Sequence, residues 1–198
     1  MTTAVQTFGL RPVFHPTGLD RATPYLVIDA TQAAYATALY KYAPVTWVTS
    51  GQINVAAAST TNWLGVMAGV DYTDANGRFV QANFLPASPT GITNIRIWVW
   101  DDPLIVYDAG FEATGAALTN TMILDQANFG GTLTPSSGST TTGLSSCGLA
   151  TTLAGAGAQG QVRILGIAPN PDNAIGDVGL VVRVQNANPQ TVAPKVAI

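Results

Sequence analysis

The residue types that build exposed helices are almost missing from this chain. Glu112 is the only glutamate, Lys41 and Lys195 are the only lysines, and Asp, Glu, Lys and Arg together make up 10% of the residues, against about a quarter in a typical soluble protein. Glu and Lys are among the best surface helix formers, whereas the Thr, Val, Asn, Gly and Pro that take their place favour strands and turns. The composition therefore predicts an all-β protein, an antiparallel β-sandwich or barrel with at most one short helix.

Apolar and polar residues alternate in short segments that are bounded by turn residues, which is the pattern of half-buried strands. The dipeptide Asn76-Gly77 predicts a tight hairpin, because both residue types tolerate positive φ. Residues 92–100 (ITNIRIWVW) predict a central strand with Trp98 and Trp100 on one face. For residues 30–39 a short helix capped by Thr31 and an extended segment are equal alternatives. The expected strands are 24–29, 45–50, 52–57, 64–72, 78–84, 92–100, 104–108, 161–167 and 178–185.

Turn-rich composition at several points divides the chain into three parts. We expect an extended N-terminal arm over residues 1–24, a β-rich domain over 25–186 and an extended C-terminal tail over 187–198. Gly, Ser and Thr dominate residues 130–160, which is typical of a flexible linker or of a loop that orders only against neighbouring subunits. Leu144, Leu149 and Leu153 could anchor this stretch, which slightly favours the second interpretation.

The charge pattern narrows the classes of partner. The chain has a net charge of −3 and a pI near 4.7, and its arginines are scattered singly, so no basic patch is expected to bind nucleic acid. The first residues carry no secretory signal pattern, and no apolar run is long enough to span a membrane. Cys147 stands alone, so neither a disulfide framework nor a thiolate metal site is expected. These features predict a protein made in a reducing cytoplasm, and a surface this poor in charge suits coverage by partners.

No catalytic constellation is evident in the sequence. His15 is the only histidine, and a structural or surface role suits it best. Residues 143–148 (GLSSCG) do not have the spacing of a serine nucleophile elbow. Asp101 and Asp102 are adjacent on a strand and point to opposite faces, so they cannot easily serve as a carboxylate pair on one substrate. We expect one of them to form an ion pair with Arg78, Arg96 or Arg163. A hydrolase that uses both is the weakest hypothesis, and no catalytic, cofactor or metal residue is predicted.

Two tryptophans allow a binding role. Trp98 and Trp100 are two residues apart on one expected strand and so share a face, an arrangement that a carbohydrate-stacking platform uses. Packing in the core or at a subunit interface explains them better. A receptor- or glycan-binding module of a virion fibre is therefore the alternative function.

Four segments together resemble a known family. Residues 8–18 (FGLRPVFHPTG), 65–80 (GVMAGVDYTDANGRFV), 100–106 (WDDPLIV) and 163–184 (RILGIAPNPDNAIGDVGLVVRV) are similar in kind and order to segments of the head decoration, or capsid cement, proteins of tailed bacteriophages. Members of that family typically begin with a Gly-Leu-Arg-Pro-like motif and a nearby histidine.

The resemblance implies a structural virion protein without catalysis. Such a protein binds the outer surface of an icosahedral head and stabilises it by clamping adjacent major capsid proteins, as a homotrimer or homodimer. Nucleic acid and membrane are not expected partners. The segment at residues 8–18 is then the expected contact with the capsid or with sister subunits, through Phe8, Leu10, Arg11, Phe14 and His15.

Overall fold

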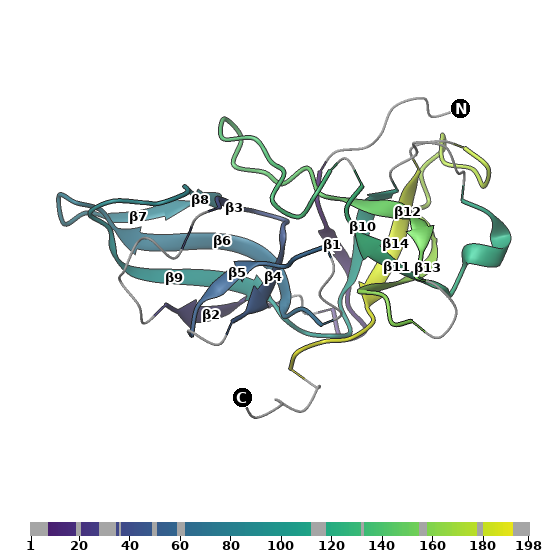
Figure 1. Ribbon diagram of the computed structural model, residues 1–198, viewed down its shortest axis with the longest axis horizontal. Coiled ribbons are helices and arrows are strands. Elements are labelled where there is room, and N and C mark those ends of the chain that lie inside the picture. The colour runs from purple at the N-terminus through teal and green to yellow at the C-terminus, as the bar shows by residue number, and fades with distance from the viewer. Residues whose placement is uncertain are drawn as a thin grey trace.

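The computed structural model describes residues 8–18, 21–27, 35, 37–48, 51–58, 62–111, 118–131, 133–154, 158–177 and 180–191. The protein is all-β, as predicted, and one 3-10 turn at Asn120–Met122 is the helical element among these residues. The chain folds into two lobes that lie side by side (Figure 1). The strands are β1 (Arg11–Phe14), β2 (Thr23–Leu26), β3 (Leu39–Tyr40), β4 (Pro44–Trp47), β5 (Ile53–Val55), β6 (Gly65–Thr73), β7 (Phe79–Ala82), β8 (Phe84–Leu85), β9 (Thr93–Trp100), β10 (Val106–Phe111), β11 (Gln126–Phe129), β12 (Gly148–Leu153), β13 (Val162–Ile167) and β14 (Val181–Asn186).

The first lobe, here called the sheet lobe, is an antiparallel sheet of strands in the order β2-β9-β6-β4-β5, with β7 paired to β6. The hairpin predicted at Asn76-Gly77 joins β6 to β7. Gly77 has φ +77°, and the carboxylate of Asp74 accepts the backbone N–H groups of Asn76 and Arg78 at 2.8 Å each. The predicted hairpin of β4 and β5 also forms, and β9 is central, as expected for residues 92–100.

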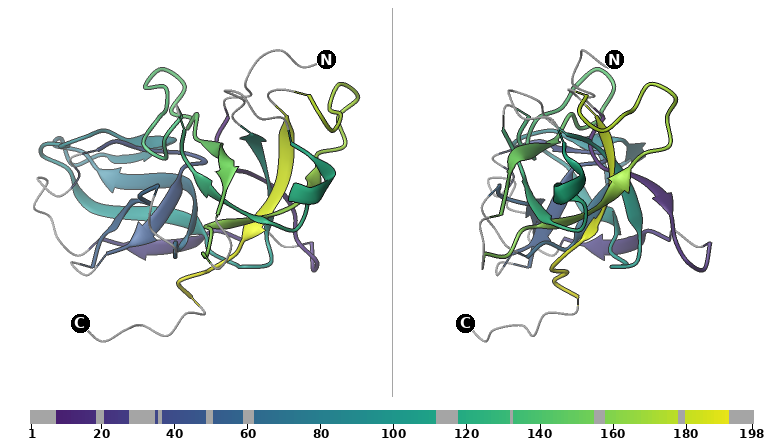
Figure 2. Two further views of the ribbon diagram at one scale, coloured as in Figure 1. Left: turned by 45° about the vertical axis from the view of Figure 1, so that its right-hand side comes forward. Right: turned by 90° about the vertical axis from the view of Figure 1, so that its right-hand side faces the viewer.

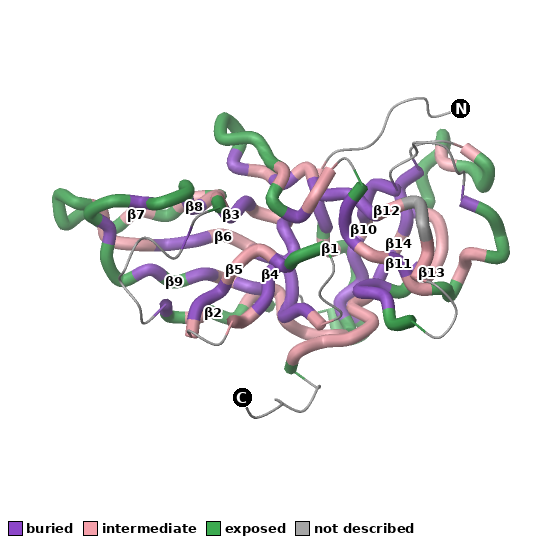
Figure 3. Tube along the Cα trace, viewed as in Figure 1, coloured by how far each residue is buried: buried purple, intermediate pink, exposed green. Residues whose placement is uncertain are grey.

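Alternation along β9 builds the core of the sheet lobe. Ile95, Ile97 and Val99 are buried, whereas Trp98 and Trp100 on the other face are half-buried. The small sheet of β3 and β8 adds to the same core, which otherwise comes from the large sheet and the segments beside it (Figure 3). Its main members are Val27, Tyr35, Leu39, Val45, Ile53, Leu64, Met67, Val70, Leu85, Ile92, Ile95, Ile97 and Val99.

The second lobe is a closed five-stranded barrel. Strands β10, β12, β11, β13 and β14 follow one another, and β14 pairs back onto β10. Strands β10 and β12 are parallel, whereas the sequence predicted antiparallel pairing. The chain reaches β12 from β10 through a long connection rather than a hairpin, which permits a parallel pair. Figure 2 shows the barrel lobe from its outer end. Its interior is filled by Tyr107, Ala109, Phe111, Ala127, Phe129, Leu149, Val162, Ile164, Val182 and Val184.

The two lobes share one of the cores. Trp63, which precedes β6 of the sheet lobe, is fully buried among the barrel residues. Its ring meets Phe129 edge-on with centroids 5.0 Å apart, and its indole N–H donates to the carbonyl of Gln161 at 2.7 Å. Strands β1 and β2 also connect the lobes. β1 pairs with β10 of the barrel, and β2, the next strand along the chain, pairs with β9 of the sheet lobe.

The described parts of the predicted arms are bound to the chain's own lobes. Within residues 1–24, β1 joins the barrel sheet and Thr23 begins β2. Within the predicted tail over 187–198, the side chain of Gln190 accepts the backbone N–H of Trp47 at 2.8 Å and donates to its carbonyl at 3.3 Å. These segments are extended, as expected, but their described parts bind strands of this same chain. The helix considered for 30–39 lies outside the described residues except at Tyr35 and at 37–39.

The Gly, Ser and Thr stretch at 130–160 packs on its own subunit rather than behaving as a linker. The backbone of Lys41 bonds to Gly143 and Ser145 at 3.0 and 2.8 Å. Cys147 and Leu149 are fully buried in the barrel core, and residues 148–153 form β12. Neither sequence interpretation of this stretch therefore holds for its described residues, because a few apolar side chains suffice to anchor it between the lobes.

Candidate functional site

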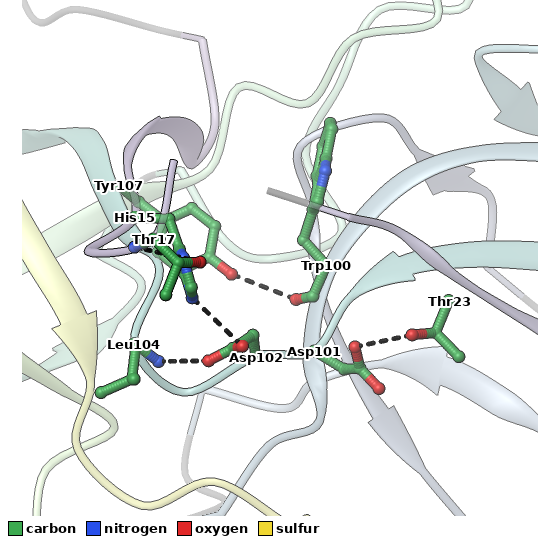
Figure 4. A network of polar contacts seen from close by, with 8 residues as sticks. All are labelled: His15, Thr17, Thr23, Trp100, Asp101, Asp102, Leu104 and Tyr107. Carbon is green, nitrogen blue, oxygen red and sulfur yellow. Dashed lines mark hydrogen bonds and ion pairs between the residues drawn. The ribbon is translucent and has the colours of Figure 1, made fainter. Parts of the chain in front are cut away.

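The region that joins the lobes contains three of the ionisable residues singled out in the sequence, namely His15, Asp101 and Asp102. Strand β9 ends at Trp100, and the turn that follows leads directly into β10. Asp102 shapes this turn, because its carboxylate accepts the backbone N–H of Leu104 at 2.8 Å. The end of β1 approaches the same turn, so residues about ninety positions apart in the sequence lie together here (Figure 4).

His15 lies at the centre of this junction and is 8% exposed. Its Nδ1 accepts the backbone N–H of Thr17 at 3.2 Å and lies 2.8 Å from the Thr17 hydroxyl. Its Nε2 lies 3.1 Å from a carboxylate oxygen of Asp102, although the contact lacks hydrogen-bond alignment. Because Nδ1 is an acceptor, the neutral ring carries its proton on Nε2, toward the carboxylate.

A hydroxyl, an imidazole and a carboxylate in a row invite comparison with a catalytic relay. Here, however, the hydroxyl belongs to Thr17, two residues from His15, and the ring nitrogen beside it already accepts a backbone N–H. The contacts therefore tie the end of β1 to the β9–β10 turn. The open pocket beside Trp98 lies on the sheet lobe and includes neither His15 nor Asp102.

Asp101 and Asp102 act in different directions, as expected for neighbours on a strand. Asp101 accepts hydrogen bonds from the hydroxyls of Thr23 at 2.9 Å and Tyr25 at 2.6 Å, which hold β2 to the end of β9. Burial, followed by the Asp101 carboxylate, raises the pKa of Tyr25 well above its ordinary value. The two carboxylates are thus engaged separately by β2 and by His15, and they do not face a common space.

A different aspartate forms the ion pair that the sequence assigned to Asp101 or Asp102. Arg96 donates from Nε to Asp71 at 2.7 Å, because the β6–β9 register places these residues opposite each other. Asp71 is 1% exposed, and its second oxygen accepts the indole N–H of Trp98 at 2.7 Å. The predicted pairing was therefore wrong in its partner, since the strand register could not be known from the local pattern.

The two tryptophans of β9 share a face but have different surroundings. Trp98 lines an open pocket of about 270 Å³ on the sheet lobe. Trp100 instead stacks on Tyr42, with ring centroids 5.9 Å apart and planes 7° apart, and packs against the core shared by the lobes. The pocket is lined mostly by small side chains, namely Ala22, Ala68, Gly69, Val70, Gln81 and Ala82 together with Trp98.

The five residues predicted to contact a partner are split between core and surface. Leu10 is fully buried in the barrel core, so its side chain packs within this chain rather than against a partner. Phe8 is half-buried and His15 is engaged at the junction. Arg11 is exposed, and the Phe14 side chain is 58% exposed. Strand β1 therefore presents Arg11 and Phe14 outward while Leu10 anchors it.

Two other classes of site, a metal centre and a membrane-spanning helix, can be judged from the described residues. No three His, Cys, Asp or Glu side chains come close enough together to hold a metal ion in the described part of the chain. No helix in those ranges has the length and hydropathy needed to cross a membrane. Comparison with protein-family models, curated proteins and solved structures gave no significant match.

Proposed function

We propose that this chain is a structural virion protein that binds the outer surface of an icosahedral phage head and clamps adjacent major capsid proteins. The observation that carries the proposal is a rigid, exposed apolar edge on the barrel. Val13 and Phe14 of β1 and Leu104 of the β9–β10 turn are 39%, 58% and 49% exposed. Strand pairing with β10 and the His15–Asp102 contact hold this edge in place, so little conformational freedom is lost when a partner covers it.

Composition and sequence resemblance support the same proposal. A chain with 10% charged residues and a net charge of −3 has a surface suited to wide, permanent contacts, which are more apolar than transient ones. The segments at 8–18, 65–80, 100–106 and 163–184 resemble head decoration proteins. The protein acts without catalysis, as a homo-oligomer.

Binding to undecorated heads tests this function directly. Purified protein is mixed with DNA-free heads of the phage that encodes it, and the heads are sedimented and then heated. We expect saturable co-sedimentation and a higher temperature of head disruption. Deletion of residues 1–18 is a poor probe, because it also removes Leu10 from the core. Heads that bind no protein, or that bind it without gaining heat resistance, would contradict the proposal.

A second candidate function, glycan binding, is favoured by the pocket beside Trp98. Its aromatic wall and small lining residues suit the face of one sugar ring, whereas Trp100 is stacked on Tyr42 and is not available for a platform of two tryptophans. A glycan array read with the wild type and with Gln81→Leu, which removes the pocket's amide, tests this candidate. An array without a saturable signal eliminates it.

A further inference from the structure

One carboxylate on the outward side of the sheet lobe is almost completely covered. Asp71 lies on β6, opposite Arg96 of β9 and Gln81 of β7, yet it is 1% exposed. Directly paired residues project to the same side of a sheet, and both partners of Asp71 are exposed. Val70, its neighbour on β6, belongs to the core of the lobe. The side chain of Asp71 therefore points away from that core.

Both oxygens of this carboxylate hold side chains of β9. One oxygen accepts the Nε–H of Arg96 and the other accepts the indole N–H of Trp98, each at 2.7 Å. A hydrogen bond to a charged acceptor is stronger than one between neutral groups. This bond fixes the orientation of the indole ring, which could otherwise turn about its side-chain torsions. Asp71 thus holds Trp98 in one position, as a supporting side chain holds a binding residue.

Glycine at position 69 keeps the pocket beside Trp98 open. Gly69 pairs with Trp98 across β6 and β9, so a side chain at position 69 would project to the same side as the indole ring. A Cβ atom there would meet the Ala82 carbonyl oxygen at 3.4 Å and otherwise open space. Because Gly69 lines the pocket, a larger residue would fill the pocket without displacing the backbone.

The lining of the pocket restricts the chemistry of its ligand. None of the described residues that line it carries a charge, so a charged ligand group would be desolvated there without a partner. The indole N–H already donates to Asp71, which leaves the ring surface for contact with a ligand. The amide of Gln81, also in the lining, can both donate and accept. The volume of about 270 Å³ lies just below the range of about 300 to 1,000 Å³ that suits drug-sized molecules, so the pocket fits a single ring.

From this geometry we infer that the pocket is a preformed subsite for one uncharged pyranose, which stacks on Trp98 and bonds through a hydroxyl to the amide of Gln81, and that Asp71 is the residue that positions Trp98. This inference rests on the second candidate function, glycan binding, and is independent of binding to phage heads. A ring that is held before the ligand arrives loses little conformational freedom on binding. Gly69 sets the space available to the sugar.

Titration with simple sugars tests the subsite and its ligand class. The probes are the methyl glycosides of glucose, galactose and mannose, followed through the indole N–H signals in a heteronuclear NMR spectrum. The chain has four tryptophans, and the signal that is missing from Trp98→Phe identifies that of Trp98. We expect at least one glycoside to shift this signal saturably. The methyl glycosides of glucuronic acid and N-acetylneuraminic acid should bind at least about tenfold more weakly, because their carboxylates find no partner in the pocket.

Three variants complete the test. Gly69→Val should lower the affinity at least about tenfold, because its side chain occupies the space of the sugar. Gly166→Val makes the same change on β13 of the barrel, where a Cβ atom meets nothing within 4 Å, and should bind within about twofold of the wild type. Asp71→Asn keeps the shape of the side chain but not its charge. It should weaken binding by about threefold or more and speed the exchange of the Trp98 indole proton with solvent.

The outcomes separate this inference from the function on which it rests. If no glycoside and no glycan of the array binds, glycan binding and the subsite are both wrong. If a glycan binds equally well to Gly69→Val and Gly166→Val, the pocket is not its site, although glycan binding stands. Equal affinity for charged and uncharged sugars, or for cyclohexanol, overturns the ligand class. Wild-type affinity in Asp71→Asn overturns the positioning role of Asp71 alone.

Discussion

Substituting Gly65 by alanine should destabilise the junction of the lobes strongly. Gly65 begins β6 beside the end of β9. A Cβ atom there would overlap the carbonyl oxygen of Trp100 and would lie 2.8 Å from its carbonyl carbon and 2.9 Å from the Cα atom of Asp101. All these atoms are backbone atoms, so no side chain can turn away to make room.

The expected cost follows from what must move. Overpacking of a well-packed site typically costs about 1 to 3 kcal/mol, and the rigid backbone neighbours place Gly65→Ala at the upper end. The Trp100 carbonyl also accepts the hydroxyl of Tyr107, which is almost fully buried, at 3.1 Å, and weakening that bond adds about 1 kcal/mol. A total of about 3 to 4 kcal/mol corresponds to a fall in melting temperature of roughly 10 °C for a protein of this size.

Gly69 on the same strand is the control. A Cβ atom there meets only the carbonyl oxygen of Ala82, at an ordinary 3.4 Å. Gly69→Ala should therefore be neutral or stabilise by up to about 1 kcal/mol, since alanine restricts the unfolded chain. Calorimetry of the two variants measures the difference. If Gly65→Ala melts within about 2 °C of the wild type, or if Gly69→Ala loses as much as Gly65→Ala, the steric reasoning is refuted.

Two further predictions concern buried polar groups. Burial raises the pKa of Asp108, so the folded state ionises this carboxyl at a higher pH than the unfolded state does, and the unfolding free energy should fall as the pH rises from about 4 toward that pKa. Chemical denaturation of Asp108→Asn at a series of pH values should not show this fall. A parallel decline of the unfolding free energy in both proteins would contradict the assignment. Gln161→Leu removes the side-chain acceptor of the Phe129 N–H and the donor to the Ala57 carbonyl, each at 2.8 Å. Chemical denaturation should show that this variant loses about 2 to 4 kcal/mol of unfolding free energy. The control Gln159→Leu, at an exposed position, should lose less than about 0.5 kcal/mol.

Local patterns predicted most of the sheet lobe. Its hairpins connect neighbours in the sequence, so turn residues such as Asn76-Gly77 and the alternation of 92–100 carry the information needed. The same patterns correctly separated Asp101 from Asp102, because adjacent strand residues always face opposite sides.

Long-range pairing was beyond such patterns. Closure of the barrel requires β10 to find β14 about seventy residues later, and no local feature specifies that register. The Asp71–Arg96 ion pair and the His15–Asp102 contact arise from the same kind of pairing. Strand β12 was missed because Gly, Ser and Thr dominate its neighbourhood, and packing of Leu149 rather than intrinsic propensity makes it a strand.

The burial of Trp63 inside the barrel limits how far the two lobes can move relative to each other. A side chain from the sheet lobe fills the barrel's core, and Gln190 ties the barrel's last strand back to Trp47. Close-packed interiors deform little, so the lobes cannot hinge freely about their junction. The protein is therefore a rigid spacer: the outer strands of the barrel and the pocket beside Trp98 are held at one fixed separation and orientation.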